Sequence, residues 1–342
     1  MTFEAFSQEW LPLIESTMYE LLANEPPALQ GLYGMMRYHL GWEDRAGQRE
    51  NAPKGKRIRP LLVLLSAKAA GGDPNLALPA AAAVELLHNF SLLHDDIEDR
   101  SFTRRHRPTV WSWAGDSHAI NSGDAMFVIS HLAMLRLQKV GLPPARTLKA
   151  LQVFDEACLR LTEGQYLDIH FETRDDITLA DYMLMIAGKT AALLSASTVL
   201  GALVAGSEEL NAYRTFGFEL GISFQIEDDI LGIWGEEAQT GKSTTGDILT
   251  RKKTLPVLYA LGRCGSAGDK LRAFYEQKSP LTDDDVPEVL TLLDSLNARI
   301  YAEQLELSHA DAALAALEKM NGDAESIKLL ASLVNRLIHR HR

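Results

Sequence analysis

Apolar residues recur at intervals of three and four along almost the whole chain, and runs with a period of two that are rich in Val, Ile and Thr are missing. The first spacing places apolar side chains on one face of an α-helix, whereas the second is the pattern of a half-buried strand. The sequence therefore predicts an all-α fold. Among the helices that we expect are those over residues 80–99, 122–139, 144–172, 179–204 and 208–234.

The length and composition of the chain allow one large core. Its 342 residues are 46% hydrophobic, and no shift in composition and no Pro- or Ser-rich linker divides them. Length alone permits either one domain or two. Because nothing in the sequence marks a boundary, we expect a single all-helical domain over residues 1–342.

The charge of the chain narrows the classes of partner. A net charge of -12 argues against a general nucleic-acid binder, which would present a basic face, and against electrostatic docking on anionic lipid. Residues 190–206 contain no charged side chain, yet they are fewer than the roughly 20 residues that span a bilayer. We expect a buried helix there, no nucleic-acid partner, and not a transmembrane protein.

The N-terminus and the cysteines bear on the location of the protein. The first residues, MTFEAF, have no basic region ahead of an apolar core, so they do not resemble a signal peptide. Cys158 and Cys264 stand in no pairing motif and in no zinc motif. We therefore predict a reducing cytoplasm as the setting of the protein.

Two acidic clusters carry most of the chemical information. The first reads DDIED over residues 95–99. Positions i and i+4 of a helix share a face about 5–6 Å apart, so Asp95 and Asp99 project together, with Asp96 alongside. Carboxylates this close repel one another unless they are solvated, paired or bound to a cation. Mg²⁺ held by a few carboxylates and by substrate phosphates is a usual arrangement.

The second cluster is Asp228-Asp229, and basic residues follow both clusters. Arg104 and Arg105 stand after the first cluster, and Lys242 and Lys252 stand after the second. Arg and Lys are the side chains that bind phosphate groups. The two clusters therefore predict a site for Mg²⁺ and a phosphate or diphosphate.

Three further segments are polar where their surroundings are apolar. Residues 55–60 (GKRIRP) place cations just before a helix, although a solvated basic turn is the simpler interpretation of that segment alone. Residues 164–168 (GQYLD) and 188–190 (GKT) interrupt apolar helices, and such interruptions cost stability unless partners satisfy them. His88 lies two turns before Asp95 on much the same face. Alone it is typical of a core histidine, but beside these cations it can donate to a second diphosphate.

Together these segments resemble the ordered motif set of the polyprenyl synthetase family, the trans-isoprenyl diphosphate synthases. The matching segments are GKRIRP at 55–60, HNFSLLHDDIED at 88–99, RRHRPT at 104–109, GQYLD at 164–168, GKT at 188–190, FQIEDD at 224–229 and GKSTTGDILTRKKTLP at 241–256. Any one motif is weak, but the ordered series is specific. The resemblance runs from about residue 50 to about residue 260.

The resemblance implies an isoprenoid synthase type helical bundle around a central cavity. It also implies a prenyltransferase that uses Mg²⁺, with three ions per active site. Such an enzyme joins isopentenyl diphosphate head to tail to an allylic diphosphate, geranyl or farnesyl diphosphate, and gives a linear all-trans prenyl diphosphate. A homodimer follows from the same resemblance, with helices near residues 122–139 at its interface.

The resemblance also assigns roles to residues. The metal residues are Asp95, Asp99 and Asp228, with Asp96, Asp168 and Asp229 in support. The residues for the allylic diphosphate are Arg104, Lys189, Lys242 and Lys252, and those for isopentenyl diphosphate are Lys56, Arg59, His88 and Arg105. Thr190 and Gln225 also contact substrate and face the carbocation with oxygen dipoles. The catalytic set is the aspartates of both clusters with Lys189, Thr190 and Gln225.

Three positions depart from the family's pattern. Gly232 stands where the second cluster often has a third aspartate, His106 where a glycine often follows the arginine pair, and Thr245 where a loop glycine is usual. These departures bear on metal affinity and on the loop.

The residues before the first cluster bear on product length, because the growing prenyl chain runs down that helix. Phe90 is bulky and obstructs, whereas Ser91 is small. In the family, an aromatic residue at the position of Phe90 but not at that of Ser91, without an insertion in the motif, goes with a C20 product. Leu87, Met126 and Phe127 could add to the floor. We therefore predict geranylgeranyl diphosphate, with C15 and C25 products as the nearest alternatives.

Two other functions are weaker alternatives. A class I terpene synthase needs metal but no isopentenyl diphosphate site, so the four residues assigned to that substrate weigh against it. A regulatory subunit of a heteromeric synthase tends to lose the aspartates, whereas this chain keeps most of them.

Overall fold

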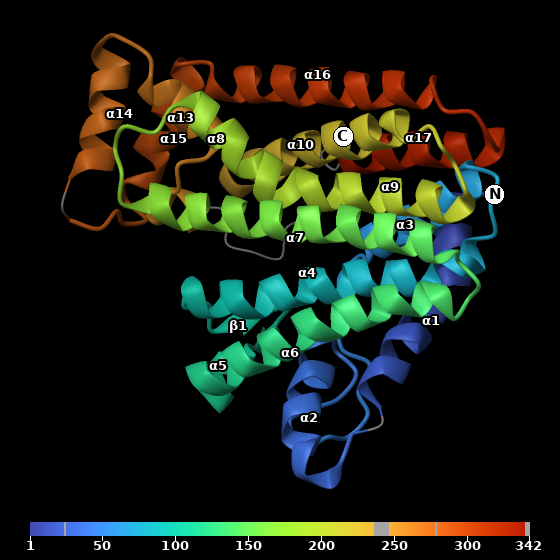
Figure 1. Cartoon of the computed structure of the whole chain (residues 1–342). Helices are drawn as coiled ribbons and strands as arrows, with labels where there is room; N and C mark the ends of the chain where they lie inside the picture. The colour runs from blue at the N-terminus through green and yellow to red at the C-terminus, as the bar shows by residue number, and fades with distance from the viewer. Residues whose placement is uncertain (24, 236–245, 278, 339–342) are drawn as a thin grey trace. The chain divides into compact units, whose positions relative to one another are not determined.

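The computed structural model describes residues 1–23, 25–235, 246–277 and 279–338. These residues are almost wholly helical (Figure 1), so the predicted all-α fold is confirmed. The α-helices are α1 (Phe3–Leu22), α2 (Gln30–His39), α3 (Ile58–Ala69), α4 (Leu78–Glu98), α5 (Val110–Ala114), α6 (Asp116–Leu135), α7 (Pro144–Glu172), α8 (Leu179–Ile186), α9 (Ala192–Ala205), α10 (Asn211–Trp234), α12 (Gly246–Leu249), α13 (Leu255–Leu261), α14 (Ser266–Glu276), α15 (Val286–Ser295), α16 (Ala298–Leu317) and α17 (Ala324–Ile338).

Short elements join the helices. Three 3₁₀ turns are η1 (Pro27–Leu29), η2 (Pro74–Ala77) and η3 (Arg136–Gln138), and the π-helical segment η4 (Ala187–Ala191) links α8 to α9. A minimal hairpin is formed by β1 (Thr103–Arg104) and β2 (Arg107–Pro108). The period of the sequence did not predict this hairpin, because strands of two residues are too short to show one.

Contacts between Cα atoms divide the chain into two compact units. The first comprises Met1–Glu156, Ala196–Leu210 and Met320–Leu330, and the second comprises Ala157–Ser195, Asn211–Lys319 and the described residues from Ala331 onward. Helices α7, α9 and α17 contribute residues to both units. The single domain expected over the whole chain stays a prediction.

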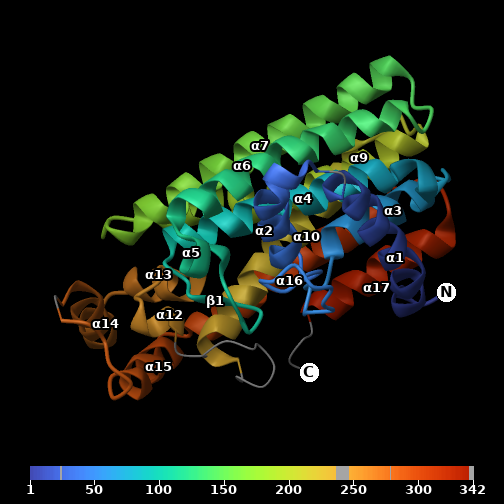
Figure 2. The same cartoon turned by 90° about the horizontal axis from the view of Figure 1, so that it is seen from below.

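The first unit is built around α4, which packs against α1, α3 and α6. Helices α4 and α6 lie side by side in both views (Figure 1 and Figure 2). The first turns of α4 are small and fully buried over residues 80–83, so neighbouring helices can approach closely. Gly201 shows the same principle on α9, because a Cβ there would lie 2.1 Å from the carbonyl oxygen of Val63 on α3. This close packing holds rigidly the helix that carries the first acidic cluster.

The second unit places α10 against α16 and the π-helical segment η4. Ile222, Ile226 and Ile230 follow one another at intervals of four on α10 and are buried. They share a core cluster with Tyr182 of α8 and Leu255 of α13. This apolar face fixes the rotation of α10 and therefore the direction in which the polar residues of its other face project.

The structure contains the predicted helices, but the predicted ends of these helices are less accurate. Helix α4 matches the predicted range 80–99 closely, whereas α6 starts at Asp116, before the predicted start at 122. The first residues of α6, DSHAIN, are mostly polar, so the apolar spacing that predicts a helix is not visible there. The predicted helix over 179–204 is interrupted by η4, since a π-helical turn has no distinct apolar pattern.

Two helical stretches, Pro74–Glu98 and Leu179–Ala205, are long and apolar enough to span a membrane by composition alone. Of their most apolar windows, 67% and 72% of the residues are buried inside the protein. The second stretch contains most of the uncharged segment at 190–206, which was predicted to be a buried helix. Burial of this extent is typical of helices in a protein core.

Candidate active site

The first acidic cluster lies at the end of α4. Asp95 is partly exposed and Asp99, the C-cap residue, is exposed, whereas the side chain of Asp96 is almost fully buried. The amide of Asp99 donates to the carbonyl oxygen of Asp95, so the last turn stays helical up to the cap. Two carboxylates one turn apart therefore project from the same face of the helix end, as the sequence predicted.

The hairpin after α4 brings the arginine pair back to this cluster. Arg104 donates from Nε to Oδ1 of Asp96 at 2.7 Å. Burial raises the pKa of Asp96 to about 6, although Arg104 acts in the opposite direction. Arg105 and His106 form the two-residue turn with φ of 52° and 62°, the left-handed geometry of a type I′ turn. Glycine adopts this geometry without strain, which explains why His106 is a departure from the family's pattern.

Arg105 lies in a crowded basic environment. Burial and, next, the charge of Arg57 lower its pKa to about 10. The side chain packs on Gly55, where a Cβ would lie 3.0 Å from Nη2 of Arg105, and Gly55 also has φ of +78°. The glycine of the GKRIRP segment is therefore required both for its turn and for the room that Arg105 occupies. A buried cation repelled by its neighbours is well suited to bind an anion.

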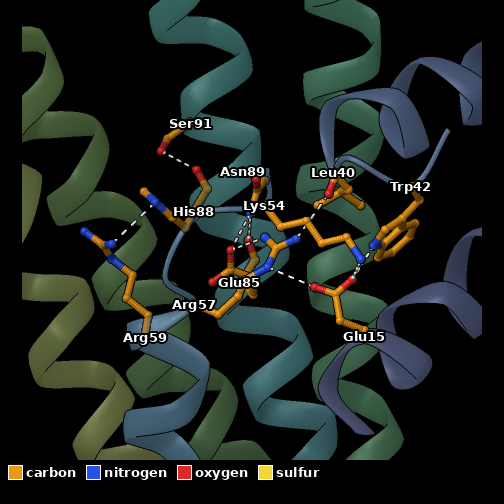
Figure 3. A network of polar contacts seen from close by, with 10 residues as sticks. All are labelled: Glu15, Leu40, Trp42, Lys54, Arg57, Arg59, Glu85, His88, Asn89 and Ser91. Atoms are coloured by element: carbon orange, nitrogen blue, oxygen red, sulfur yellow. Dashed lines mark hydrogen bonds and ion pairs between the residues drawn. The ribbon is translucent and has the colours of Figure 1, made fainter. Parts of the chain in front are cut away.

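The residues predicted for isopentenyl diphosphate meet in this first unit. Nη1 of Arg59 lies 3.4 Å from Nε2 of His88 (Figure 3). The pKa of His88 falls well below its usual value because of burial and then the charges of Arg59 and Arg105. This shift favours the neutral imidazole of His88. Lys56, which directly follows Gly55 in the same segment, is exposed.

Arg57 was not among the predicted site residues, and the structure gives it a distinct role (Figure 3). Its guanidinium donates to Glu85 of α4 at 2.5 Å and to Glu15 of α1 at 3.0 Å, and it lies 3.3 Å from the carbonyl oxygen of Leu40. The side chains of Arg57 and Glu85 are 2% and 3% exposed. Asn89 also donates to Glu85 at 2.7 Å. This network ties the GKRIRP segment to the helix of the first acidic cluster.

In the second unit, the GQYLD and GKT segments contact each other. Nζ of Lys189 lies 2.5 Å from Oδ2 of Asp168. Gly164 and Gly188 allow this approach, because a Cβ on Gly164 would lie 2.1 Å from the amide nitrogen of Lys189. Lys189 and Thr190 belong to the π-helical turn η4, a feature often found at functional sites. The two polar interruptions in the sequence are therefore partners.

Thr190 and Gln225 form a chain of hydrogen bonds that ends at the second acidic cluster. Thr190 donates from Oγ1 to Oε1 of Gln225 at 2.7 Å, and Nε2 of Gln225 donates to Oδ1 of Asp229 at 3.2 Å. Oδ2 of Asp229 accepts from the hydroxyl of Tyr182 at 2.5 Å and from the amide of Leu255 at 3.0 Å. Burial raises the pKa of Asp229 to about 6. These donors suit the supporting role expected of Asp229, and the partly exposed Asp228 precedes it.

The structure also explains the departure at Gly232. A Cβ at this position would lie 2.2 Å from Oδ2 of Asp247, so the carboxylate of Asp247 occupies the space beside the glycine. Gly232 is one helical turn after Asp228 on the same face of α10. Sequence reasoning missed Asp247, although the absent third aspartate was a signal to search for a replacement. Lys252 is exposed, and Lys242 and Thr245 lie outside the described residues.

The donor set fits Mg²⁺. Asp95, Asp99 and Asp228 present carboxylates at least partly to solvent, and carboxylate oxygens are the ligands that Mg²⁺ prefers. Asp96, Asp168 and Asp229 contact Arg104, Lys189 and Gln225, respectively. The division into three leading and three supporting aspartates stays a prediction.

The residues that bear on product length lie on α4 and α6. The ring of Phe90 is partly buried and lies 5.0 Å from the ring of Phe127 and 4.9 Å from that of His94, measured between centroids. Ser91 donates its hydroxyl to the carbonyl oxygen of His88, so it takes little room beside the helix (Figure 3). Leu87 and Met126 are fully buried.

Comparison with known proteins gives a consistent result. Residues 44–293 match the family described as Polyprenyl synthetase. The (2E,6E)-farnesyl diphosphate synthase of Mycobacterium tuberculosis is 41% identical over 297 residues, which cover 85% of this chain and 80% of that protein. The geranylgeranyl diphosphate synthase of the same organism is 40% identical over 285 residues, which cover 83% and 80%.

A solved structure agrees with these relatives. The crystal structure of a polyprenyl synthetase from Streptomyces coelicolor A3(2) has a TM-score of 0.88 and 31% sequence identity, and the match covers 98% of each chain. The chain therefore belongs to the polyprenyl synthetase family and is a prenyltransferase that makes trans-prenyl diphosphates.

Proposed function

We propose that this prenyltransferase joins isopentenyl diphosphate head to tail to geranyl or farnesyl diphosphate and releases geranylgeranyl diphosphate. The observation that carries the C20 length is the ring pair of Phe90 and Phe127, 5.0 Å apart, beside the small Ser91. An aromatic pair that bridges α4 and α6 resists displacement more than one ring would. Relatives named for farnesyl and for geranylgeranyl products are almost equally similar to this chain, so the proposed length is argued from these side chains and not from overall similarity.

We assign the metal sites to the aspartates that face solvent. Asp95 of α4, the C-cap residue Asp99 and Asp228 of α10 bind Mg²⁺ together with the allylic diphosphate, at three ions per active site. When bound, the ions neutralise the charge that develops on the departing diphosphate. Asp96 and Asp229 hold neighbouring side chains in place through the contacts described above.

The reaction begins when the C–O bond of the allylic diphosphate breaks. Arg104, Lys189, Lys242 and Lys252 stabilise the diphosphate that leaves. Thr190 and Gln225 direct oxygen dipoles at the allylic cation, and their hydrogen bond of 2.7 Å fixes both side chains. The double bond of isopentenyl diphosphate then attacks the cation and forms the new C–C bond. The departing diphosphate accepts the proton that is lost when the new double bond forms.

Isopentenyl diphosphate binds to the basic cluster of the first unit. Arg105 supplies a buried guanidinium with a lowered pKa, and His88 beside Arg59 supplies a neutral donor. Lys56 adds an exposed cation at the rim. This site distinguishes a chain-elongating enzyme from one that only ionises a single prenyl diphosphate.

Product analysis tests the proposed length. We expect geranylgeranyl diphosphate from isopentenyl and farnesyl diphosphates with Mg²⁺, and longer chains from Phe90→Ala, because that change removes one ring of the pair. Ser91→Phe adds a second aromatic residue and should shorten the product to C15. Phe102→Ala removes a ring that is 67% exposed and serves as the matched control. Chains of C30 or longer from the unmodified protein would refute the assignment of Phe90.

A separate variant tests the metal assignment. Asp95→Ala should lose at least about a thousandfold in turnover, which corresponds to roughly 4 kcal/mol of transition-state stabilisation. Its circular dichroism spectrum should remain that of the unmodified protein, because Asp95 is partly exposed at a helix end. Full activity in this variant would exclude Asp95 as a metal ligand.

We also propose a homodimer formed through α6. Ile120, Val128, Leu132 and Leu135 lie along this helix and are 44%, 56%, 52% and 45% exposed in the single chain. Apolar side chains at intervals of three, four and eight share one helix face and require a partner. Leu132→Glu should convert a dimeric mass in analytical ultracentrifugation to a monomeric one. A monomer of the unmodified protein at micromolar concentration would refute the proposal. The cytoplasmic location stays a prediction.

A further inference from the structure

A small pocket in the first unit lies beside Arg105, and its lining also includes residues that have no role assigned so far. The end of α2, the hairpin and the end of α4 meet there, and each contributes polar groups. Its lining residues include Tyr38, His39, Asp96, Arg104, Arg105 and Arg107. Three arginines in so small a volume repel one another unless anions lie between them.

Most of the cationic groups of this pocket already have protein partners. Arg104 donates to Asp96 at 2.7 Å, and Arg107 donates to Glu50 at 2.8 Å. Two buried donor-capable atoms of the lining lack a hydrogen-bond partner among the residues that the structure describes, Nη1 of Arg105 and Nε2 of His39. A buried polar atom without a partner costs about 1–3 kcal/mol, and such atoms in native proteins require an explanation. A bound anion would satisfy both.

The position of His39 is imposed by its neighbour in the chain. Tyr38 donates its hydroxyl to the carbonyl oxygen of Pro108 at 2.8 Å. Arg107 donates to the carbonyl oxygen of Tyr38 at 2.8 Å, and its guanidinium carbon lies 4.0 Å from the centre of the Tyr38 ring. These contacts clamp the last turn of α2 to the hairpin whose turn contains Arg105. His39 follows immediately and is thereby held at the pocket.

The charge of His39 is suited to such a crowded site. Burial, followed by the charges of Arg105 and Arg104, holds the pKa of His39 well below its usual value. A neutral imidazole has one N–H group, which can donate to an anion without adding to the repulsion among the arginines. The N–H group of His39 can therefore orient a bound anion at a place where a further positive charge would be unfavourable.

We propose that Nε2 of His39 donates a hydrogen bond to the same diphosphate that Arg105 binds, the diphosphate of isopentenyl diphosphate. This inference rests on the proposed function, since Arg105 was assigned to that substrate. His39 is then a substrate-binding residue on α2, outside every motif that identified the family. It approaches the diphosphate together with the hairpin, while His88 and Arg59 approach from α4 and α3.

Steady-state kinetics test the proposal. His39→Ala should raise KM for isopentenyl diphosphate about tenfold, the effect of one hydrogen bond of ordinary strength. KM for farnesyl diphosphate and the turnover number at saturation should stay within about twofold. His39→Gln places an amide nitrogen near the position of Nε2 and should recover part of the affinity. His106→Asn removes an exposed imidazole from the adjacent turn and should leave both KM values unchanged.

A binding experiment separates this inference from the proposed function. Calorimetric titration with inorganic pyrophosphate, in the presence of a chelator, measures the pocket without turnover. His39→Ala should weaken pyrophosphate binding about tenfold, and His39→Gln should weaken it less. An unchanged affinity in a folded His39→Ala protein, or a rise in KM for farnesyl diphosphate alone, would refute the role of His39. An unmodified protein that binds pyrophosphate but makes no prenyl diphosphate would instead refute the proposed function.

Discussion

The buried pair of Arg57 and Glu85 allows a quantitative prediction about how the GKRIRP segment is held. Arg57 has φ of +49°, a left-handed conformation that costs a non-glycine residue about 1–2 kcal/mol. Its contacts with Glu85 and Glu15 must offset that cost. Arg57→Met would remove these contacts and leave the carboxylate of Glu85, whose side chain is only 3% exposed, without its cation.

The expected loss of stability can be estimated from these contacts. Removal of one partner of a buried ion pair costs about 3–5 kcal/mol. Asn89 would still donate to Glu85 at 2.7 Å, so we expect the lower end, about 3 kcal/mol in the free energy of unfolding. The double variant Arg57→Met/Glu85→Met removes both charges and should cost less than the sum of the two single variants, by at least about 1 kcal/mol.

Urea denaturation, followed by circular dichroism and by tryptophan fluorescence, measures these free energies. Because Arg57 lies between Lys56 and Arg59 in the chain, Arg57→Met should also raise KM for isopentenyl diphosphate. Arg37→Met is the matched control, since Arg37 makes comparably buried ion pairs with Glu25 and Glu43. It should destabilise the protein without the same change in KM. A loss below about 1 kcal/mol for Arg57→Met, or equal KM effects in both variants, would refute the reasoning.

Three further predictions concern pH, metal and packing. The pKa values of His39 and His88 are lowered in the folded protein, so the unfolded chain binds protons first as the pH falls below about 6.5. Each of these histidines should therefore lower the free energy of unfolding by about 1.4 kcal/mol per pH unit. In urea titrations between about pH 6.5 and 5, the double variant His39→Gln/His88→Gln should show a shallower dependence of this free energy on pH. Asp247→Asn should weaken the binding of Mn²⁺ in the presence of pyrophosphate, because the carboxylate of Asp247 lies beside Gly232. Electron paramagnetic resonance measures this binding, and an unchanged affinity for Mn²⁺ would exclude a contribution of Asp247 to the metal site. Gly164→Ala would place a Cβ 2.1 Å from the backbone nitrogen of Lys189. It should therefore destabilise the protein by about 1–3 kcal/mol and raise KM for the allylic diphosphate. An unchanged melting temperature would contradict this steric argument.

The sequence by itself determined the fold class and most of the chemistry. The period of three and four along the chain predicted helices, because each helix must bury one apolar face, and α4 and α10 are close to their expected ranges. The ordered motifs predicted a polyprenyl synthetase. These properties depend on residue types and on spacing within single helices, which are local and can be read directly.

The pairing of motifs across the chain could be predicted only in part. The sequence indicated that the polar interruptions at Asp168 and Lys189 needed partners, but it did not show that they are partners of each other. Likewise, it assigned Asp96 and Asp229 as supporting residues without naming the donors, Arg104 and Tyr182, that engage them. Contacts between distant segments depend on how whole helices pack, and spacing within one helix does not contain that information.

Only the tertiary structure decided which charged residues are structural and which remain available to substrate. Arg57 and Arg59 stand two positions apart in one motif, yet one is buried between glutamates and the other lies against His88. His39 has no motif at all, and it reaches the pocket because Tyr38 is clamped to the hairpin. The physical reason is the same in each case: burial and neighbouring charges set what an ionisable group can do, and both arise only when the chain has folded.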